Sequence, residues 1–328
     1  TYPHGGGHWW VPLQYVRGLQ DLGAEVWWME EYGRPNLDPA SLRLFTDRMT
    51  RLGLIDRCIV WKRGDADAIE VVVGREADMD RLVDSADVLL NFNYEMPTEI
   101  VDRFSVAALV DIDPGLFQHW TAEGQLSPSE HQRYVTVGET VGTSAARFPD
   151  LDVDWIRIRP PVHLPSWPVH PVPEGAAYTT VSQWWGDDEW ILERDGTVYD
   201  NNKRAAFLAY LDLPSHVPVK LELALNLALA ADTGRVGPDD AERDLLEQHG
   251  WTVSHAYHVA GDPFAYRRYI EASAGEFSVV KPSCIRFQNA WISDRTICYL
   301  ATGRPAVVQH TGPSELLPDD EGLFRFAD

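Results

Sequence analysis

Six prolines lie within residues 159–173, at positions 160, 161, 165, 168, 171 and 173. Proline fixes φ and removes the backbone N–H, so such a stretch neither pairs as a central strand nor continues a helix. Residues 159–175 are therefore predicted to form a stiff, extended linker. This linker divides the 328-residue chain into residues 1–158 and 176–328, and the length is ordinary for two domains.

Short apolar runs alternate with helical stretches on both sides of this linker. Strands are expected at 24–29, 58–61, 69–73, 88–90, 106–110, 178–181, 217–225, 251–254, 277–280 and 305–309. Helices are expected at 12–22, 39–52, 76–85, 97–103, 203–211, 238–248, 263–274 and 293–303. The run 217–225 also fits a helix that continues to 231. This alternation predicts an α/β fold of two Rossmann-like, doubly wound domains that face each other across a cleft.

Charge and cysteine content exclude several classes of protein. Asp and Glu number 50 against 28 Lys and Arg, and the formal charge of −22 argues against nucleic-acid and anionic-membrane partners. No apolar run approaches the ~20 residues of a membrane span. The cysteines at 58, 284 and 298 are too widely spaced to indicate a disulfide framework or a cysteine-based metal site. A cytoplasmic location is expected.

A glycine-rich turn ending in His8 precedes the first expected helix. Such a turn usually follows a strand, so a further strand is expected before residue 1. In doubly wound sheets, ligands bind where turns of this kind lead into helices, and glycine lets the backbone approach a ligand closely. His8 is thus a candidate general base, or a histidine that merely caps the helix. The neighbouring candidates for binding an acceptor are Gly6, Gly7, Trp9 and Trp10.

A carboxylate is needed to orient His8 and to stabilise its charged form. Asp113 follows the strand expected at 106–110 and is the first candidate, although the sequence at 113–115 reads equally well as a turn. Glu139 and Asn93 are weaker candidates on the same argument. Asp111 and Asp113 also resemble the manganese-binding Asp-x-Asp of single-Rossmann glycosyltransferases. That motif recurs at 65–67, 78–80 and 152–154 in this acidic chain, so chance explains it and no metal is predicted.

A second candidate site surrounds the helix expected to begin at Ser293. Exposed N–H groups and the helix dipole favour anions at such a start. Asp294 would compete with a phosphate for these amides, and it is better suited to accept a hydrogen bond from a sugar hydroxyl. The alternative is a helix cap beside a solvated charge. The cations expected near this site are Lys281, Arg286 and Arg295.

The motifs around both sites resemble those of bacterial nucleotide-sugar glycosyltransferases of the two-Rossmann (GT-B) fold. His8, followed by Pro12, Leu13 and Gly23, resembles the opening helix of these enzymes. The more specific match comprises 275–278, Lys281, Arg286, Trp291, 293–295, 298–301, 303–305 and 309–312.

This resemblance implies an activity and roles for further residues. A nucleoside diphosphate would lie at Ser293, Lys203 would hold its oxygens, and Trp184 would line the cleft. The sugar would lie near Gln309, His310, Thr311 and Gly312. The expected activity is metal-independent and cofactor-free transfer of this sugar to a small-molecule acceptor, such as a natural product.

The sequence departs from that family in ways that leave the stereochemistry open. Ala290 and Cys298 occupy the places of two glutamates found in many retaining members, and the His-Gly-Gly turn of many inverting members is absent. An NAD-dependent oxidoreductase is a weaker alternative, because Trp10 stands where a dinucleotide fingerprint requires its third glycine. A nucleotide-sugar epimerase, a hydrolase and a non-catalytic binding protein of the same fold also stay open.

Overall fold

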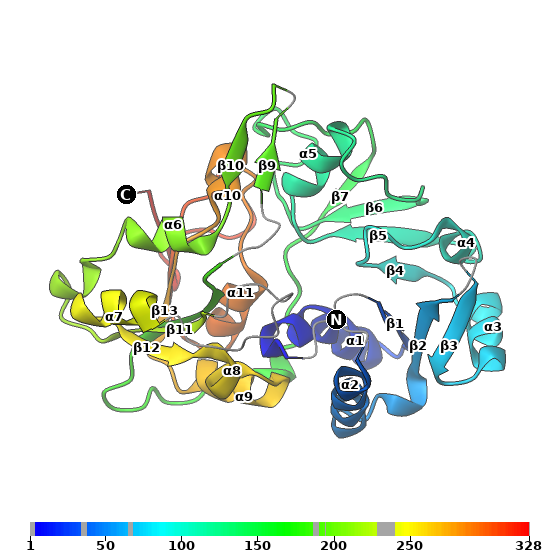
Figure 1. The fold of residues 1–328 in the computed structure, drawn as a ribbon, viewed down its shortest axis with the longest axis horizontal. Coiled ribbons are helices and arrows are strands. Elements are labelled where there is room, and N and C mark those ends of the chain that lie inside the picture. Colours follow the sequence, from blue (N-terminus) through cyan, green and yellow to red (C-terminus); the bar gives the residue numbers. More distant parts are fainter. Residues whose placement is uncertain are drawn as a thin grey trace.

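A computed structural model of the chain describes residues 4–33, 38–64, 68–185, 190–193, 195–227 and 240–327. The protein is an α/β protein with parallel sheets of six and four strands (Figure 1). The helix expected to start at 238 and the alternative helix up to 231 lie partly outside the described residues. Among the residues that are described, no helix combines the length and the apolar character that crossing a membrane requires.

The second half of the chain forms one six-stranded parallel sheet in the order β12-β11-β8-β13-β14-β15. Most residues of its four inner strands are buried, as is usual for a parallel sheet that is covered on both faces. The strands are β8 (Tyr178–Gln183), β11 (Leu221–Asn226), β12 (Thr252–His255), β13 (Gly275–Ser278), β14 (Ala306–Gln309) and β15 (Leu323–Phe326). The helices are α6 (Lys203–Leu208), α7 (Asp240–Gln248), α8 (Ala256–Ala260), α9 (Pro263–Glu271), α10 (Pro282–Phe287) and α11 (Asp294–Ala301). The hairpin of β9 (Trp190–Leu192) and β10 (Val198–Asp200) follows β8.

The first half forms two sheets instead of one. β1 (Trp28–Glu31), β2 (Cys58–Arg63) and β3 (Ile69–Val73) make a mixed sheet. The parallel sheet contains β4 (Leu89–Asn91), β5 (Ala107–Asp111), β6 (Arg133–Thr136) and β7 (Trp155–Arg157). Side chains connect the edge strands β1 and β4, and the Asn93 amide donates to Glu31 at 3.0 Å. The helices of this half are α1 (Gly6–Asp21), α2 (Pro39–Arg51), α3 (Glu76–Ser85), α4 (Thr98–Val101) and α5 (Leu116–Ala122).

Helix α1 begins at Gly6, six residues before the start predicted from Pro12. Pro12 lies inside the helix, and the glycines at 6 and 7 belong to its first turn. The reason is a tertiary contact, because a Cβ atom at Gly6 would lie 2.3 Å from the Ala260 carbonyl oxygen. Only glycine allows this approach of α1 to the end of α8.

One hydrophobic cluster contains residues from both halves of the chain. Helix α1 lies near the middle of the molecule and contacts α9 and α11 (Figure 1). Trp167 of the proline-rich segment is 1% exposed and packs against Trp10, with ring centroids 4.6 Å apart. The proline-rich segment is therefore anchored to the body of the protein. The cluster includes Trp9, Trp10, Leu13, Val16, Trp28, Trp167, Tyr266, Ile270, Cys298 and Tyr299.

Candidate functional site

His8 lies in the first turn of α1, and its side chain is exposed to solvent. Although the residue keeps solvent contact, nearby protein atoms partly desolvate the ring and lower the pKa of His8, and the positive charge of Lys281 acts in the same direction. The negative charge of Asp113 opposes both effects and raises this pKa. His8 is thus within electrostatic range of Asp113 from the first half and of Lys281 from the second half.

A buried network at the end of β5 fixes the backbone of Asp113. The Asp113 N–H donates to Asp111 Oδ1 at 3.0 Å and to the Tyr94 hydroxyl at 3.1 Å. Gln118 and Thr136 each donate to Asp111 Oδ2 at 2.8 Å. Burial raises the pKa of Asp111 to about 6, and the bonds from Gln118 and Thr136 oppose that rise. Asp111 therefore holds the segment that carries Asp113.

Asp113 also lies near charged groups of the second half. The pKa of Asp294 is raised to about 6, mainly by burial. The negative charge of Asp113 adds to this rise. It also contributes to raising the pKa of the Cys284 thiol, again after burial. Asp113 of the first half is thus within electrostatic range of both His8 and Asp294, and Lys281 is within electrostatic range of His8.

A small pocket lies at the carboxyl ends of β13 and β14, next to the start of α11. Ser293 caps α11, because its hydroxyl accepts a hydrogen bond from the Arg295 N–H at 3.2 Å. The start predicted for this helix is confirmed. The pocket brings together four predicted donor-binding residues, namely Lys203, Ser293, Arg295 and Gln309.

Arg295 lines this pocket, but its guanidinium group is bound to the protein. It forms an ion pair with Glu276 at 2.6 Å and donates to the Val181 carbonyl at 2.8 Å and the Ser278 hydroxyl at 2.6 Å. The Arg295 side chain is 12% exposed and that of Glu276 is fully buried. A diphosphate would have to compete with these bonds, so its contact with Arg295 stays a prediction.

Lys203 is the cation of the pocket that is best placed to meet an anion. It is partly buried in the first turn of α6, and its ammonium group donates to the Val279 carbonyl. Burial lowers the pKa of Lys203 to about 7, and the charge of Arg295 adds to this effect. An anion next to Lys203 would restore its charged form.

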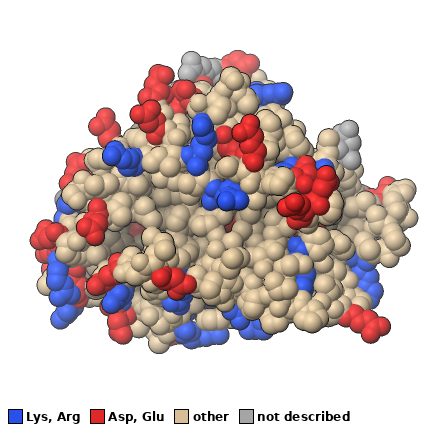
Figure 2. All heavy atoms as spheres, turned by 180° about the vertical axis from the view of Figure 1, so that it is seen from behind, with Lys and Arg blue, Asp and Glu red and all other residues tan. Residues whose placement is uncertain are grey.

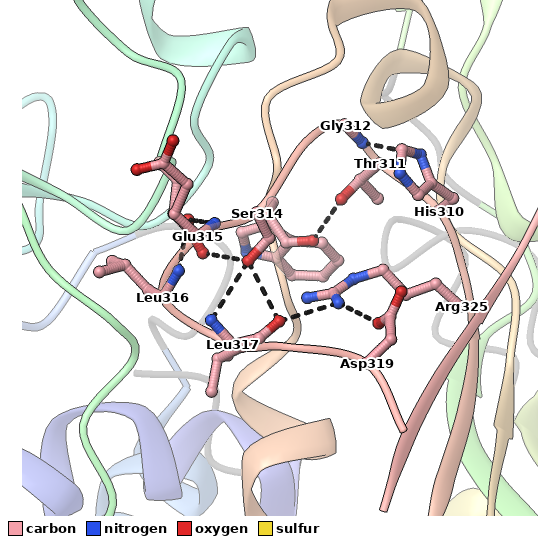
Figure 3. Close-up of polar contacts among 11 residues, drawn as sticks. His310, Thr311, Gly312, Ser314, Glu315, Leu316, Leu317, Asp319 and Arg325 are labelled. Atoms are coloured by element: carbon pink, nitrogen blue, oxygen red, sulfur yellow. Dashed lines mark hydrogen bonds and ion pairs between the residues drawn. The ribbon is translucent and has the colours of Figure 1, made fainter. Parts of the chain in front are cut away.

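Figure 3 shows the segment after β14, which carries the predicted sugar-binding residues. Hydrogen bonds to Glu139 join this segment to the first half. Thr311 donates to the Trp291 carbonyl at 2.7 Å, and His310 Nδ1 accepts from the Gly312 N–H at 3.2 Å. Gly312 has φ of +136°, and a Cβ there would lie 2.5 Å from the Gln288 carbonyl oxygen. Glu139 of the first half accepts from the Ser314 hydroxyl at 2.6 Å and from the N–H groups of 315 and 316. Glu139 thus binds this segment, and no bond to His8 is found among its described contacts.

Several other predicted residues lie away from the pocket. Trp184 is fully buried, stacks on Phe207 and donates to Glu242 at 2.9 Å. Arg286 is exposed on α10, where it pairs with Glu193 at 2.5 Å and lies over the Tyr199 ring. The predicted acceptor-binding residues Gly6, Trp9 and Trp10 are buried in the packing of α1, and Gly7 faces Tyr266. Trp184, Trp9 and Trp10 therefore belong to the core.

Sequence reasoning missed the supporting residues Tyr94, Gln118 and Thr136 around Asp111. No local pattern marks them, because they come from three separate segments that only the folded sheet brings together. No group of three or more His, Cys, Asp or Glu residues that could hold a metal occurs within the described parts of the chain. On the face seen in Figure 2, basic and acidic side chains are interspersed, and no single large patch of one sign dominates.

Comparison with known proteins identifies no family. No protein-family model matches the chain, and no curated protein does. One solved structure with a weak likeness comprises the adenylation, ketoreductase and pseudo Asub domains of a keto acid-selecting NRPS module. The identity is 13% and the TM-score 0.24, over 87% of this chain and 30% of that one. At this TM-score the likeness supports no conclusion about fold or function.

Proposed function

We propose that the protein is a glycosyltransferase of the two-Rossmann type, which moves a sugar from a nucleoside diphosphate to a hydroxyl group of a small-molecule acceptor. The observation that carries the proposal is the pocket at the start of α11, which is lined by Lys203, Ser293 and Gln309. The charges of Lys281 and Asp113 both act on His8. A base and an anion-binding region then adjoin each other at the boundary between the two halves. The proposed location is the cytoplasm.

In the proposed reaction His8 removes the proton of the acceptor hydroxyl. Because the pKa of His8 is lowered, the ring is neutral and able to accept a proton at neutral pH. The Asp113 carboxylate would stabilise the imidazolium that forms. Lys203 and the N–H groups at the start of α11 would stabilise the negative charge of the departing diphosphate.

The first test is a thermal-shift panel of UDP, dTDP, GDP, ADP and NAD, each with and without EDTA. A ligand that binds only the folded state raises the melting temperature. We expect one nucleoside diphosphate to raise it, whether or not EDTA is present. A shift with NAD alone would overturn the proposal in favour of an oxidoreductase.

Two variants then test the proposed base. His8→Ala is expected to abolish transfer and to leave nucleotide affinity unchanged, because His8 would act only on the acceptor. Asp113→Asn removes a charge that raises the pKa of His8, so the acid limb of the pH–rate profile should move to lower pH. NMR titration of the His8 ring gives the same pKa without an assay. Full turnover by His8→Ala would exclude His8 from the mechanism.

A further inference from the structure

Two buried polar side chains contact each other at the start of α10. Asn201 follows β10, Ser283 lies in the first turn of α10, and each is 1% exposed. The Ser283 N–H donates to Asn201 Oδ1 at 2.8 Å, which fixes the amide. Within the described structure, Asn201 Nδ2 and Ser283 Oγ have no hydrogen-bond partner. Because an unpaired buried polar atom is costly, two of them side by side suit a ligand or a water molecule that supplies the missing bonds.

The pair is flanked in sequence by two lysines of the proposed anion-binding region. Lys203 follows Asn201 by two residues, and Lys281 precedes Ser283 by two. Cys284, directly after Ser283, is within electrostatic range of both lysines and of Asp113. A sugar attached to a diphosphate at Lys203 would therefore be sought first near Asn201 and Ser283.

We propose that Asn201 and Ser283 bind hydroxyl groups of the sugar that is transferred. This inference rests on the proposed function. Asn201 Nδ2 supplies a donor, and the Ser283 hydroxyl both donates and accepts, which suits the hydroxyl groups of a sugar ring. Both side chains are neutral, whereas the charged Lys203 and the start of α11 suit the phosphate oxygens. A site built to bond hydroxyl groups discriminates strongly against ligands that lack them.

Access to this subsite requires a small movement, because the two unpaired atoms have no solvent contact. The segments that enclose them are the end of β10, which leads into Asn201, and the start of α10. Arg286 of α10 joins these segments through its exposed ion pair with Glu193 and its contact with the Tyr199 ring. Exposed ion pairs are weak, so this contact is easily opened.

The test compares a nucleoside diphosphate with its glucose ester by titration calorimetry, for example UDP with UDP-glucose, using the nucleoside that binds in the thermal-shift panel. Asn201→Ala and Ser283→Ala are each expected to weaken binding of the glucose ester at least tenfold and to leave the Kd of the diphosphate unchanged. Ser283→Ala keeps the backbone bond to Asn201 and removes only an unpaired hydroxyl, so its melting temperature should not fall.

Asn202→Ala is the matched control. The Asn202 side chain already has a partner, because it caps α6 by accepting from the Ala205 N–H at 3.0 Å. Its loss should lower the melting temperature without any selective effect on the glucose ester. Equal weakening of both ligands by Asn201→Ala and Ser283→Ala would assign the pair to phosphate and overturn the inference. No effect on either ligand would assign it to a buried water molecule and overturn it too. Failure of every nucleoside diphosphate to bind the wild-type chain would overturn the proposed function itself.

Discussion

Lys203 shows how one buried charge links ligand binding to pH. Its pKa is lowered to about 7 in the folded protein, mainly by burial, whereas the unfolded chain keeps the proton up to about 10.5. Between these values the unfolded state binds more protons, so the contribution of Lys203 to stability rises with pH across this window. Below pH 7 the ammonium group stays charged in the folded protein, and its desolvation lowers the free energy of unfolding unless an anion lies beside it.

A diphosphate at Lys203 should therefore bind together with a proton. We expect proton uptake at pH 8, and an affinity that falls as the pH rises above about 7, since the bound anion favours the ammonium form. Calorimetry at pH 8 in two buffers of different ionisation enthalpy measures the uptake. In Lys203→Met the uptake should disappear. Wild-type binding without any proton uptake would place the anion elsewhere.

For single residues, the sequence predicts contacts between near neighbours in the chain better than contacts between distant residues. The cap formed by Ser293 could be predicted because its partner, the Arg295 N–H, is two residues away. The burial of Trp184 could not be predicted, because its partners Phe207 and Glu242 are distant in sequence. The same holds for the ion pair of Arg295 with Glu276, which depends on a neighbouring strand.

At the scale of elements, α1 is determined as much by its neighbours as by its own sequence. Pro12 and Gly23 predicted a helix between them, but Pro12 suggested too late a start. The close approach of Gly6 to the carbonyl groups of Ala260 and Asp262 gives the helix its additional turn. That turn carries His8, so the packing of α1 on the second half also positions the proposed base.

Two glycines of α1 provide a matched pair of substitutions. Gly6→Ala should destabilise the fold by about 1–3 kcal/mol, because its Cβ would overlap backbone atoms at the end of α8. Gly18→Ala has no atom within 4 Å of its Cβ and should stabilise the fold by about 0.5–1 kcal/mol through helix propensity. Urea unfolding measures both free energies. Similar effects of the two variants would contradict the observed contact.

At the scale of the molecule, the cluster around Trp10 and Trp167 connects the halves that the proline-rich segment was predicted to separate. The prolines predicted an extended segment, whereas the structure has a short 3-10 helix at Leu164–Ser166 within it. They gave no sign that Trp167 would be buried, since burial depends on α1 and α9. The alternation of strands and helices likewise predicted the α/β class, but it did not predict two sheets in the first half.

The shared cluster predicts that the halves unfold together. Scanning calorimetry should give one transition, because exposing Trp10 and Trp167 disrupts packing in both halves at once. The unfolding transitions followed by near-UV circular dichroism of the tryptophans and by far-UV circular dichroism should therefore coincide. Two resolved transitions would show that each half is stable without the other. A variant such as Trp167→Ala should lower the single midpoint without splitting it.

The separation of β1 from β4 has a consequence for handling the protein. Among the described strands, each of these is paired on one side only, and such edges are templates for strand addition between molecules. The formal charge of −22 opposes this contact by mutual repulsion. Salt screens that repulsion over about 10 Å at 0.1 M. We therefore expect aggregation to be slowest in dilute salt, where the surface charge keeps the molecules apart.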